Sequence, residues 1–382
     1  MEEKKIFVVK PSMPPLDEFV DEIRDMWDTG ILTHQGPKHN RLNRELEQFM
    51  GVSNVTLFAN GHLALELGIH SLKMQGEVIT TPFTFASTTQ AILRNGLVPV
   101  FCDIRPDDFT MDADKIEALI TDKTCAIVPV HVYGNICDVE KIRRIAEKYK
   151  LKVIYDGAHA FGETYQGANV AAFGDMVMFS FHATKVLSTV EGGCLVYRDA
   201  KQKEYLEGLR QFGQIVKTEK NPYIGTNAKM TEMHAAMGLC NLVHFKEYIE
   251  KRREVVMRYR ANLADAKGIQ MNVVQEGVDS NYAYFPIVVH EDRAGFTVRD
   301  VIDALVAHNI FVRRYFYPLC SDFECIADMG IRSHVPMAKY VSDRVITLPC
   351  YSDLTLEDVD RISNIILSLY RKDRERKEAE IN

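Results

Sequence analysis

A lysine and a carboxylate lie at the ends of two apolar, strand-like runs of this sequence. Lys185 follows the run 176–181 after a serine and a histidine, and two glycines come shortly after it. Asp156 ends the earlier run 152–156. A lysine amine can form a Schiff base with an aldehyde, and a carboxylate can keep a pyridine nitrogen protonated. These are the two groups that a pyridoxal phosphate site requires.

The elements that must position these residues alternate between short β-rich runs and helical patterns from residue 50 onward. Strands are expected at 54–59, 77–81, 98–103, 125–133, 152–156, 176–181 and 194–197, and helices at 61–74, 88–94, 112–120 and 139–148. Near-continuous apolar strands separated by helices are typical of a mostly parallel sheet that is covered on both faces. In such sheets ligands bind beyond the carboxyl ends of the strands, where Asp156, Ser180 and Lys185 fall.

The pattern changes after about residue 230. A long helical stretch is expected at 231–266, then a strand at 282–289, a helix at 298–308, a strand at 311–316 and a helix at 354–369. A chain of 382 residues is too long for one small core. We therefore expect an α/β protein with a large cofactor-binding domain at 1–245 and a small α+β domain at 246–382.

Composition limits the class of protein. The chain is 46% hydrophobic and 26% charged, and its net charge of -7 argues against a nucleic-acid surface. Its eight cysteines form no CxxC pair, which favours reduced thiols in a cytoplasmic protein. No run of about 18 apolar residues is present, and the first residues lack the apolar segment of a signal peptide. We expect neither a nucleic acid nor a membrane as partner.

Two further strand ends carry candidate cofactor contacts. Gly61 and His62 open a helix directly after a strand, and the free amides of a helix start bind phosphate, which Gly61 allows to approach closely. A plain strand-to-helix turn is the alternative. Phe85 follows the next strand and could stack on a flat cofactor, or it could be a core aromatic. The common nucleotide fingerprints GxGxxG and GxxxxGK[ST] are absent at these turns.

The remaining candidates surround the two residues of the opening motif. Asp156 needs a partner because burying an unpaired carboxylate is costly, and either a cationic pyridinium or the start of a following helix would supply one. His159 could bond the phenolate oxygen of the cofactor or be a satisfied core histidine. Ser180 can donate to a phosphate. Lys185 must be neutral to attack a carbonyl. The alternative for Lys185 is an ordinary solvated lysine. The cofactor site is favoured because several suitable groups occur in order along the chain, each at or near the end of a strand.

Motifs along almost the whole chain resemble those of one family. They are 32–37, 59–65, 82–88, 99–103, 130–135, 155–160, 180–193, 225–230, 315–319 and 348–351. These motifs resemble the sugar aminotransferases of the DegT/DnrJ/EryC1/StrS group, which are pyridoxal phosphate enzymes of fold type I. The resemblance implies a mostly parallel central sheet flanked by helices, with a smaller α+β C-terminal domain.

The resemblance also implies a role for each matching residue. Lys185 would form the Schiff base and move the proton, Asp156 would hold the pyridinium nitrogen, and His159 the ring oxygen. The other cofactor contacts would be Gly61, His62, Phe85, Ser180 and Asn227. Because Asn227 would reach the cofactor of the partner subunit, a homodimer with shared active sites is implied. His62 departs from the Thr or Ser that is common in the family.

The substrate follows from the same resemblance. The segment 180–193 is similar to that of relatives that aminate C4 of a sugar rather than C3, and Lys185 argues against the dehydratase branch, which carries His there. The implied substrates are a dTDP-linked 4-keto-6-deoxyhexose and L-glutamate. The implied substrate contacts are Thr33, His182, Glu191, Lys229, Arg313 and Tyr317. Lys229 stands where Arg is common, so it lacks the planar fork, and Arg313 and Arg314 could equally form an exposed strand edge.

Two alternatives stay open from the sequence. The same fold could act on a C3-keto sugar, a UDP-linked sugar or a keto-cyclitol, because no residue is identified that reads the nucleotide base. The chain could also be a non-catalytic regulator or scaffold with this fold. The complete set of Asp156, Ser180 and Lys185 argues against that second alternative.

Overall fold

A seven-stranded sheet forms the centre of the larger part of the protein. The computed structural model describes residues 4–215, 218, 220–331 and 333–381, with side chains described as far as residue 370. The strands are β2 (Val55–Phe58), β3 (Glu77–Thr80), β4 (Val98–Phe101), β5 (Thr124–Val128), β6 (Lys152–Asp156), β9 (Met176–Ser180) and β10 (Gly193–Tyr197). Their order is β2-β10-β9-β6-β5-β3-β4, and only β10 runs against the others. The mostly parallel α/β fold predicted from the sequence is confirmed.

Helices cover both faces of this sheet, which explains why its strands are mostly apolar. On one face lie α4 (Gly61–Ser71), α5 (Ala86–Arg94) and α7 (Gln202–Leu209), and on the other α3 (Pro37–Met50), α6 (Val139–Tyr149) and α8 (Glu232–Val243). Alternate residues of β6 enter different cores: Ile154 packs with α4 and α5, whereas Val153 and Tyr155 pack with α6. A strand buried on both sides needs apolar residues at every position.

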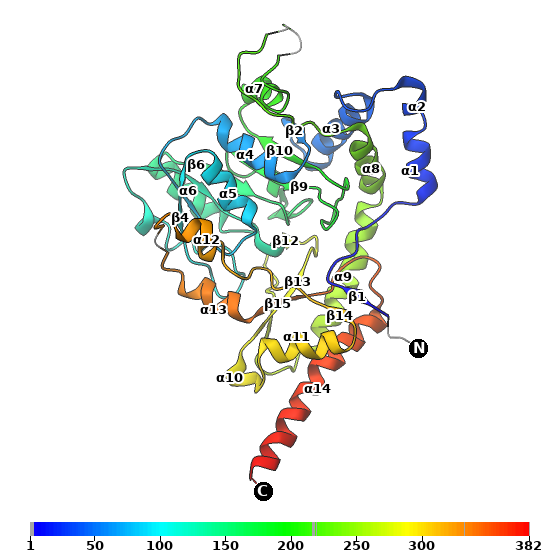
Figure 1. Cartoon of the computed structure of the whole chain (residues 1–382), viewed down its shortest axis with the longest axis vertical. Coiled ribbons are helices and arrows are strands. Elements are labelled where there is room, and N and C mark those ends of the chain that lie inside the picture. Colours follow the sequence, from blue (N-terminus) through cyan, green and yellow to red (C-terminus); the bar gives the residue numbers. More distant parts are fainter. Residues whose placement is uncertain (1–3, 216–217, 219, 332, 382) are drawn as a thin grey trace.

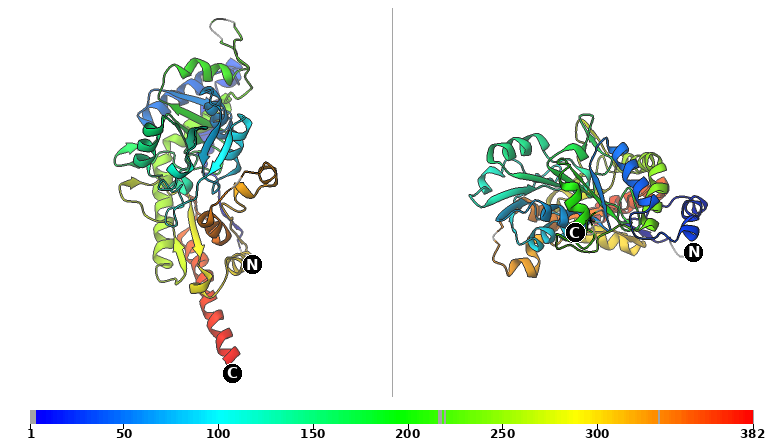
Figure 2. Two further views of the ribbon diagram at one scale, coloured as in Figure 1. Left: turned by 90° about the vertical axis from the view of Figure 1, so that its left-hand side faces the viewer. Right: turned by 90° about the horizontal axis from the view of Figure 1, so that it is seen from above.

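The smaller part is built on an antiparallel sheet in the order β11-β13-β15. Its strands are β11 (Ile269–Met271), β13 (Phe285–Val289) and β15 (Val345–Leu348), and its helices are α9 (Phe245–Asn262), α11 (Val298–Ala307) and α14 (Leu356–Ile381). In Figure 1 these strands and helices lie below the large sheet. In Figure 1 and in the left view of Figure 2, α14 extends beyond the rest of the protein to the C-terminus.

The N-terminal strand packs with the small part. β1 (Ile6–Phe7) pairs in parallel with β14 (Ile310–Phe311), and Ile6 is fully buried in the second core. The division at 245 and 246 stays a prediction. It falls at the first residue of α9, whose Phe245 packs in a core of the large sheet and whose Val255 packs in the core of the small part. The helix therefore joins the two cores.

The remaining elements are short. They are α1 (Leu16–Ile23), α2 (Met26–Thr29), α10 (Glu291–Ala294), α12 (Glu324–Ala327), α13 (Pro336–Arg344), and the small sheet of β12 (Val278–Asp279), β7 (Thr164–Tyr165) and β8 (Ala168–Asn169). None of the helices in the described part of the chain combines the length and apolar character needed to cross a membrane.

Four sequence predictions of local structure need correction. The strand expected at 125–133 ends at Val128 and is followed by a 3-10 helix at Val132–Gly134. The helix expected at 112–120 is absent: the segment is a series of turns with a short 3-10 helix at Glu117–Leu119, and the Asp112 carboxylate accepts the amide of Asp114 at 3.1 Å. Such local bonds compete with helix formation. The long helix at 231–266 is two helices that meet at His244, and the strand at 311–316 ends at Phe311.

Candidate active site

A cavity of about 560 Å³ opens at the carboxyl ends of the parallel strands. Segments that follow β2, β3, β5, β6 and β9 line it, and Tyr284, Tyr315 and Phe316 close it from the small part. The predicted site residues in its lining are Gly61, His62, Phe85, Asp156, His159, Ser180, His182, Lys185 and Glu191. Residues more than 120 positions apart in the sequence thus meet in one place.

Asp156 presents a buried carboxylate to this cavity. It is the last residue of β6 and is 4% exposed. The Thr88 hydroxyl donates to Oδ2 at 2.7 Å and the Ala158 amide donates to Oδ1 at 3.0 Å. Burial raises the pKa of Asp156, against the effect of these two bonds and of the nearby Lys185 amine. A cationic ligand next to the carboxylate would offset the desolvation that raises its pKa.

His159 is held as a neutral imidazole. It is 7% exposed, and its Nδ1 accepts the backbone amide of Tyr133 at 3.0 Å. Burial first, and then the charge of Lys185, lower the pKa of His159 well below its ordinary value. Because Nδ1 accepts a hydrogen bond, Nε2 carries the hydrogen and can donate to a ligand oxygen.

Lys185 lies on a turn that extends the β9–β10 pair. Its backbone amide donates to the His182 carbonyl at 2.9 Å, and the Thr189 amide donates to the Phe181 carbonyl at 2.8 Å. The side chain is half-buried, and Nζ donates to the hydroxyl of Tyr284 at 3.4 Å. The amine of Lys185 therefore points toward the small part of the protein. Lys185 and Tyr284 line the same cavity.

One corner of the cavity has the character of a phosphate site. The Asn60 side chain caps α4 by accepting the Leu63 amide at 2.8 Å, so α4 begins at Gly61. A Cβ at Gly61 would lie 2.9 Å from Cβ of Ser180, and a Cβ at Gly193 would lie 2.6 Å from Cα of Gly61. Only glycines allow this approach, which brings the start of α4 beside the Ser180 hydroxyl.

His62 bonds to the neighbouring helix α5 and to its own helix α4. Its Nδ1 lies 2.9 Å from Oγ of Ser87, and its Nε2 lies 3.2 Å from Glu66, which Arg94 also contacts at 2.8 Å. Ser87 lines the cavity beside His62. A hydroxyl is thus present at this corner, although the residue at position 62 does not carry one.

Phe85 exposes a large aromatic ring beside the cavity. It precedes α5 and is 62% exposed. A flat ligand stacked on this ring would remove apolar surface from water. The alternative of a core aromatic is wrong for Phe85, whereas the neighbouring Phe83 is fully buried.

Some predicted site residues lie outside the cavity lining, namely Thr33, Asn227, Lys229, Arg313 and Tyr317. Thr33, Asn227 and Arg313 are exposed. Lys229 donates to the Asn227 side chain at 2.6 Å, and burial together with Arg210 lowers the pKa of Lys229. The ring of Tyr317 lies 3.6 Å below the guanidinium of Arg314.

The sequence analysis did not single out Thr88, Tyr284, Tyr315 or Phe316 as site residues. Thr88 lies in the motif 82–88. Its hydrogen bond to Asp156 stabilises the ionised carboxylate more than any other contact. Tyr284 directly precedes β13, where an aromatic residue is unremarkable in a sequence. Its place in the cavity depends on how the two parts of the chain pack.

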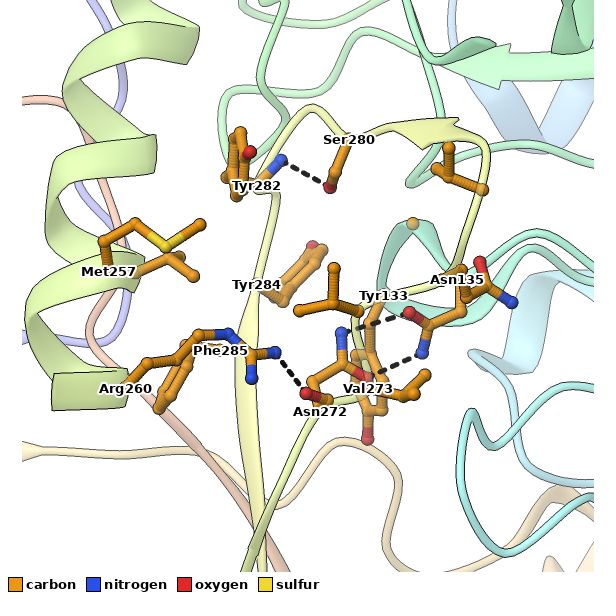
Figure 3. A pocket seen from close by; sticks show the side chains of 15 residues that line it. Tyr133, Asn135, Met257, Arg260, Asn272, Val273, Ser280, Tyr282, Tyr284 and Phe285 are labelled. Atoms are coloured by element: carbon orange, nitrogen blue, oxygen red, sulfur yellow. Dashed lines mark hydrogen bonds between the residues drawn. The ribbon is translucent and has the colours of Figure 1, made fainter. Parts of the chain in front are cut away.

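Tyr284 also lines a second cavity, of about 70 Å³. Figure 3 shows Tyr284 and Tyr133 in its wall, with Arg260 on one side and Asn135 on the other. Arg260 donates to the Asn272 carbonyl, and the Asn135 and Asn272 side chains bond at 2.7 Å and 3.1 Å. This volume holds water-sized occupants rather than a substrate.

Comparison with known proteins places this geometry in a family. Residues 16–367 match the DegT/DnrJ/EryC1/StrS aminotransferase family. The chain belongs to this family, as its motifs predicted, and is an aminotransferase.

Relatives and solved structures match the chain over nearly its whole length. It is 42% identical to a dTDP-4-amino-4,6-dideoxy-D-glucose transaminase of Shigella dysenteriae (95% of this chain, 99% of the relative). It is 40% identical to a transaminase of the same name from Escherichia coli (96% and 99%). The structure of DesI in the presence of its TDP-sugar product has a TM-score of 0.92 at 30% identity (99% and 96%). The pyridoxal phosphate form of the putative sugar aminotransferase Spr1654 of Streptococcus pneumoniae has a TM-score of 0.89 at 25% identity (97% and 100%).

Proposed function

We propose that the chain is a pyridoxal phosphate-dependent aminotransferase that converts dTDP-4-dehydro-6-deoxy-D-glucose to the 4-amino sugar, with L-glutamate as donor. The observation that carries the proposal is the meeting of Lys185, Asp156 and His159 in one cavity. The two transaminases that share 40% and 42% of their residues with the chain support the choice of acceptor.

The residues of the cavity fit the cofactor. The Asp156 carboxylate, buried without an ion pair among the described residues, would hold a protonated pyridine nitrogen. Nε2 of His159 would donate to the ring oxygen. The start of α4 at Gly61 and His62, together with the Ser180 hydroxyl, would hold the phosphate. Phe85 would stack on the ring.

Lys185 carries the proton transfers in this proposal. When bound, pyridoxal phosphate supplies an aldehyde that takes the amino group and a ring that withdraws electrons from the reacting carbon. Nζ of Lys185 removes a proton from the α-carbon of glutamate in the first half-reaction and delivers a proton to C4 of the sugar in the second. The carboxylate of Asp156 would hold the protonated ring nitrogen of the bound cofactor.

His182 and Glu191 are the proposed sugar contacts inside the cavity. The two side chains are 3.6 Å apart at Nε2 and Oε1 and both line the cavity next to Lys185. The other proposed substrate contacts, Thr33, Lys229, Arg313 and Tyr317, lie outside its lining. They would meet the nucleotide part of the substrate at the rim of this cavity or of the partner's.

We propose a homodimer whose active sites are shared, with Asn227 reaching the partner's cofactor. Asn227 and Lys229 are exposed or half-exposed on a segment outside the cavity of their own chain. Large apolar side chains are exposed nearby in the sequence, with Phe212 at 63% and Ile224 at 95%. Light scattering is expected to give twice the chain mass of 43.5 kDa. A monomer at micromolar concentration would contradict the shared site.

The proposed compartment is the cytoplasm. All eight cysteines are free, and all but Cys125 and Cys325 are buried. Reduced, buried thiols are typical of proteins that fold in a reducing compartment.

Absorption spectroscopy of the purified protein tests the proposed function. L-glutamate is expected to remove the visible band of the lysine-bound cofactor, and dTDP-4-dehydro-6-deoxy-D-glucose is expected to restore it. D-glutamate and the UDP-linked 4-keto sugar serve as controls for the donor and the nucleotide. If L-glutamate removes the band but only the UDP-linked sugar restores it, the proposed dTDP-linked acceptor is wrong. The proposed amino-transfer reaction is then still supported. No visible band after incubation with pyridoxal phosphate would overturn the proposal.

A further inference from the structure

Tyr284 brings a phenol hydroxyl from the small part of the protein to the amine of Lys185. Nζ of Lys185 donates to Oη of Tyr284 at 3.4 Å and lies 5.8 Å from the centre of its ring. Tyr284 is 7% exposed and lines the same cavity as Lys185. The contact joins the strand β13 region to the turn after β9, although the two residues are 99 positions apart.

The ring of Tyr284 is packed on several sides. Its centroid lies 4.6 Å from that of His159, 6.1 Å from that of Tyr133 and 6.1 Å from that of Tyr315. Figure 3 shows the ring between the β13 strand and Tyr133. Three neighbouring aromatic rings limit the freedom of the Tyr284 ring to turn, so the hydroxyl stays near Lys185.

Asn281 anchors the backbone that carries Tyr284. It is 2% exposed, and its side-chain amide donates to the carbonyls of His159 at 2.8 Å and Phe161 at 3.1 Å. Its Oδ1 accepts the Ala283 amide at 2.9 Å. One buried side chain therefore fixes the segment of His159 and the segment of Tyr284 relative to each other.

Arg252 anchors the same segment from α9. Its side chain is 1% exposed, and its Nη1 donates to the carbonyls of Ala283 at 3.3 Å and Cys350 at 2.9 Å. Two hydrogen bonds from a buried guanidinium hold the accepting carbonyls tightly, because losing them would leave more of a desolvated charge without partners. Asn281 thus ties the segment of Tyr284 to the large part of the protein, and Arg252 ties the same segment to the small part.

We infer that Tyr284 is a positioning residue for Lys185, whose hydroxyl holds Nζ while the amine is not bonded to the cofactor. The inference rests on the proposed role of Lys185 in proton transfer. A free lysine side chain has many rotamers, and the transfer requires Nζ at one place. The contact also makes the position of the catalytic amine depend on the packing of the small part against the large part.

Tyr284→Phe removes the hydroxyl and keeps the ring, and Tyr282→Phe is the matched control because Tyr282 lines only the smaller cavity. Tyr284→Phe is expected to slow the half-reaction with L-glutamate by about 10- to 100-fold, with KM within about twofold, since a misplacement of about 1 Å can cost that much. The deuterium isotope effect with α-deuterated glutamate should increase. Tyr282→Phe should match the unchanged protein in both measurements.

A second readout uses the cofactor-free protein and no turnover. Mixing it with pyridoxal phosphate and following the visible band measures how quickly Lys185 bonds to the aldehyde. Tyr284→Phe is expected to slow this rate several-fold and to leave the final amplitude and the melting temperature unchanged. An unchanged rate and an unchanged isotope effect would overturn the inference and leave the proposed function intact. Absence of the band in the unsubstituted protein would instead refute the proposed function.

A double substitution separates positioning from structural damage. A small amine added to Lys185→Ala can replace the missing side chain as the base. If Tyr284 acts through Lys185, adding Tyr284→Phe to Lys185→Ala will not lower the amine-rescued rate further. A further loss of about tenfold in that background would show that Tyr284 acts by another route and would overturn the inference.

Discussion

Lys185→Ala is expected to lower the rate of amino transfer by roughly 10⁴-fold or more, because it removes both the bond to the cofactor and the base that moves the proton. The fold should persist. The side chain is half-buried, and its amine makes a 3.4 Å hydrogen bond to Tyr284, so the free energy of unfolding should change by less than about 1 kcal/mol. Single-turnover spectra with L-glutamate and thermal melting of the cofactor-free protein measure the two effects.

The control for this substitution is Lys148→Ala. Lys148 is an exposed lysine on α6 that pairs with Glu117 at 2.6 Å and is not part of the cavity lining. The Lys148→Ala variant should retain full activity. The residue is outside the cavity, and losing an exposed ion pair changes stability little. Activity of Lys185→Ala within about tenfold of the unchanged protein, without added amine, would refute the assignment of Lys185.

Asp156→Asn has the second-largest expected effect, and it should act in opposite directions on activity and stability. Loss of the negative charge beside the ring nitrogen should lower the rate by roughly 10²- to 10³-fold, the cost of removing one electrostatic contact in a buried site. The cofactor-free protein should be at least as stable as before at neutral pH. The asparagine removes a desolvated charge and can still bond to Thr88 and Ala158.

The pH dependence of stability gives a separate check on Asp156. Burial raises its pKa in the folded, cofactor-free protein, whereas the unfolded chain has the ordinary value of about 4. Between these two values the folded state binds more protons, so this carboxyl makes the protein less stable as the pH rises through that window. The difference in melting temperature between Asp156→Asn and the unchanged protein should therefore grow with pH from about 4 upward. A difference that shrinks with rising pH would contradict the raised pKa.

Bound cofactor should reverse the sign of this effect. A positive ring nitrogen beside Asp156 favours the ionised carboxylate, so cofactor retention should weaken as the pH falls and the carboxyl takes up a proton. In Asp156→Asn the retention should be weaker and less sensitive to pH in this range. Dialysis followed by absorption of the retained cofactor measures both.

Local patterns in the sequence predicted most of the large sheet and the residues at its carboxyl edge. The strands are four to five residues long and mostly apolar on both faces, and each is followed by a helix or a turn. Asp156, Ser180 and Gly61 could be found because a carboxylate, a hydroxyl and a glycine at strand ends stand out against apolar neighbours. The helix expected at 112–120 failed where a side chain bonds locally, as Asp112 does with Asp114.

The sequence by itself determined the family, the α/β class and the chemical groups at the strand ends, because these depend on residue type and on periodicity along the chain. Only the tertiary structure decided which side chains reach those groups. Tyr284 contacts Lys185, and Asn281 contacts the carbonyl of His159, across 99 and 122 positions of the chain. Contacts at such separations are set by how distant segments of the chain pack together in the folded core, and no local pattern records that packing.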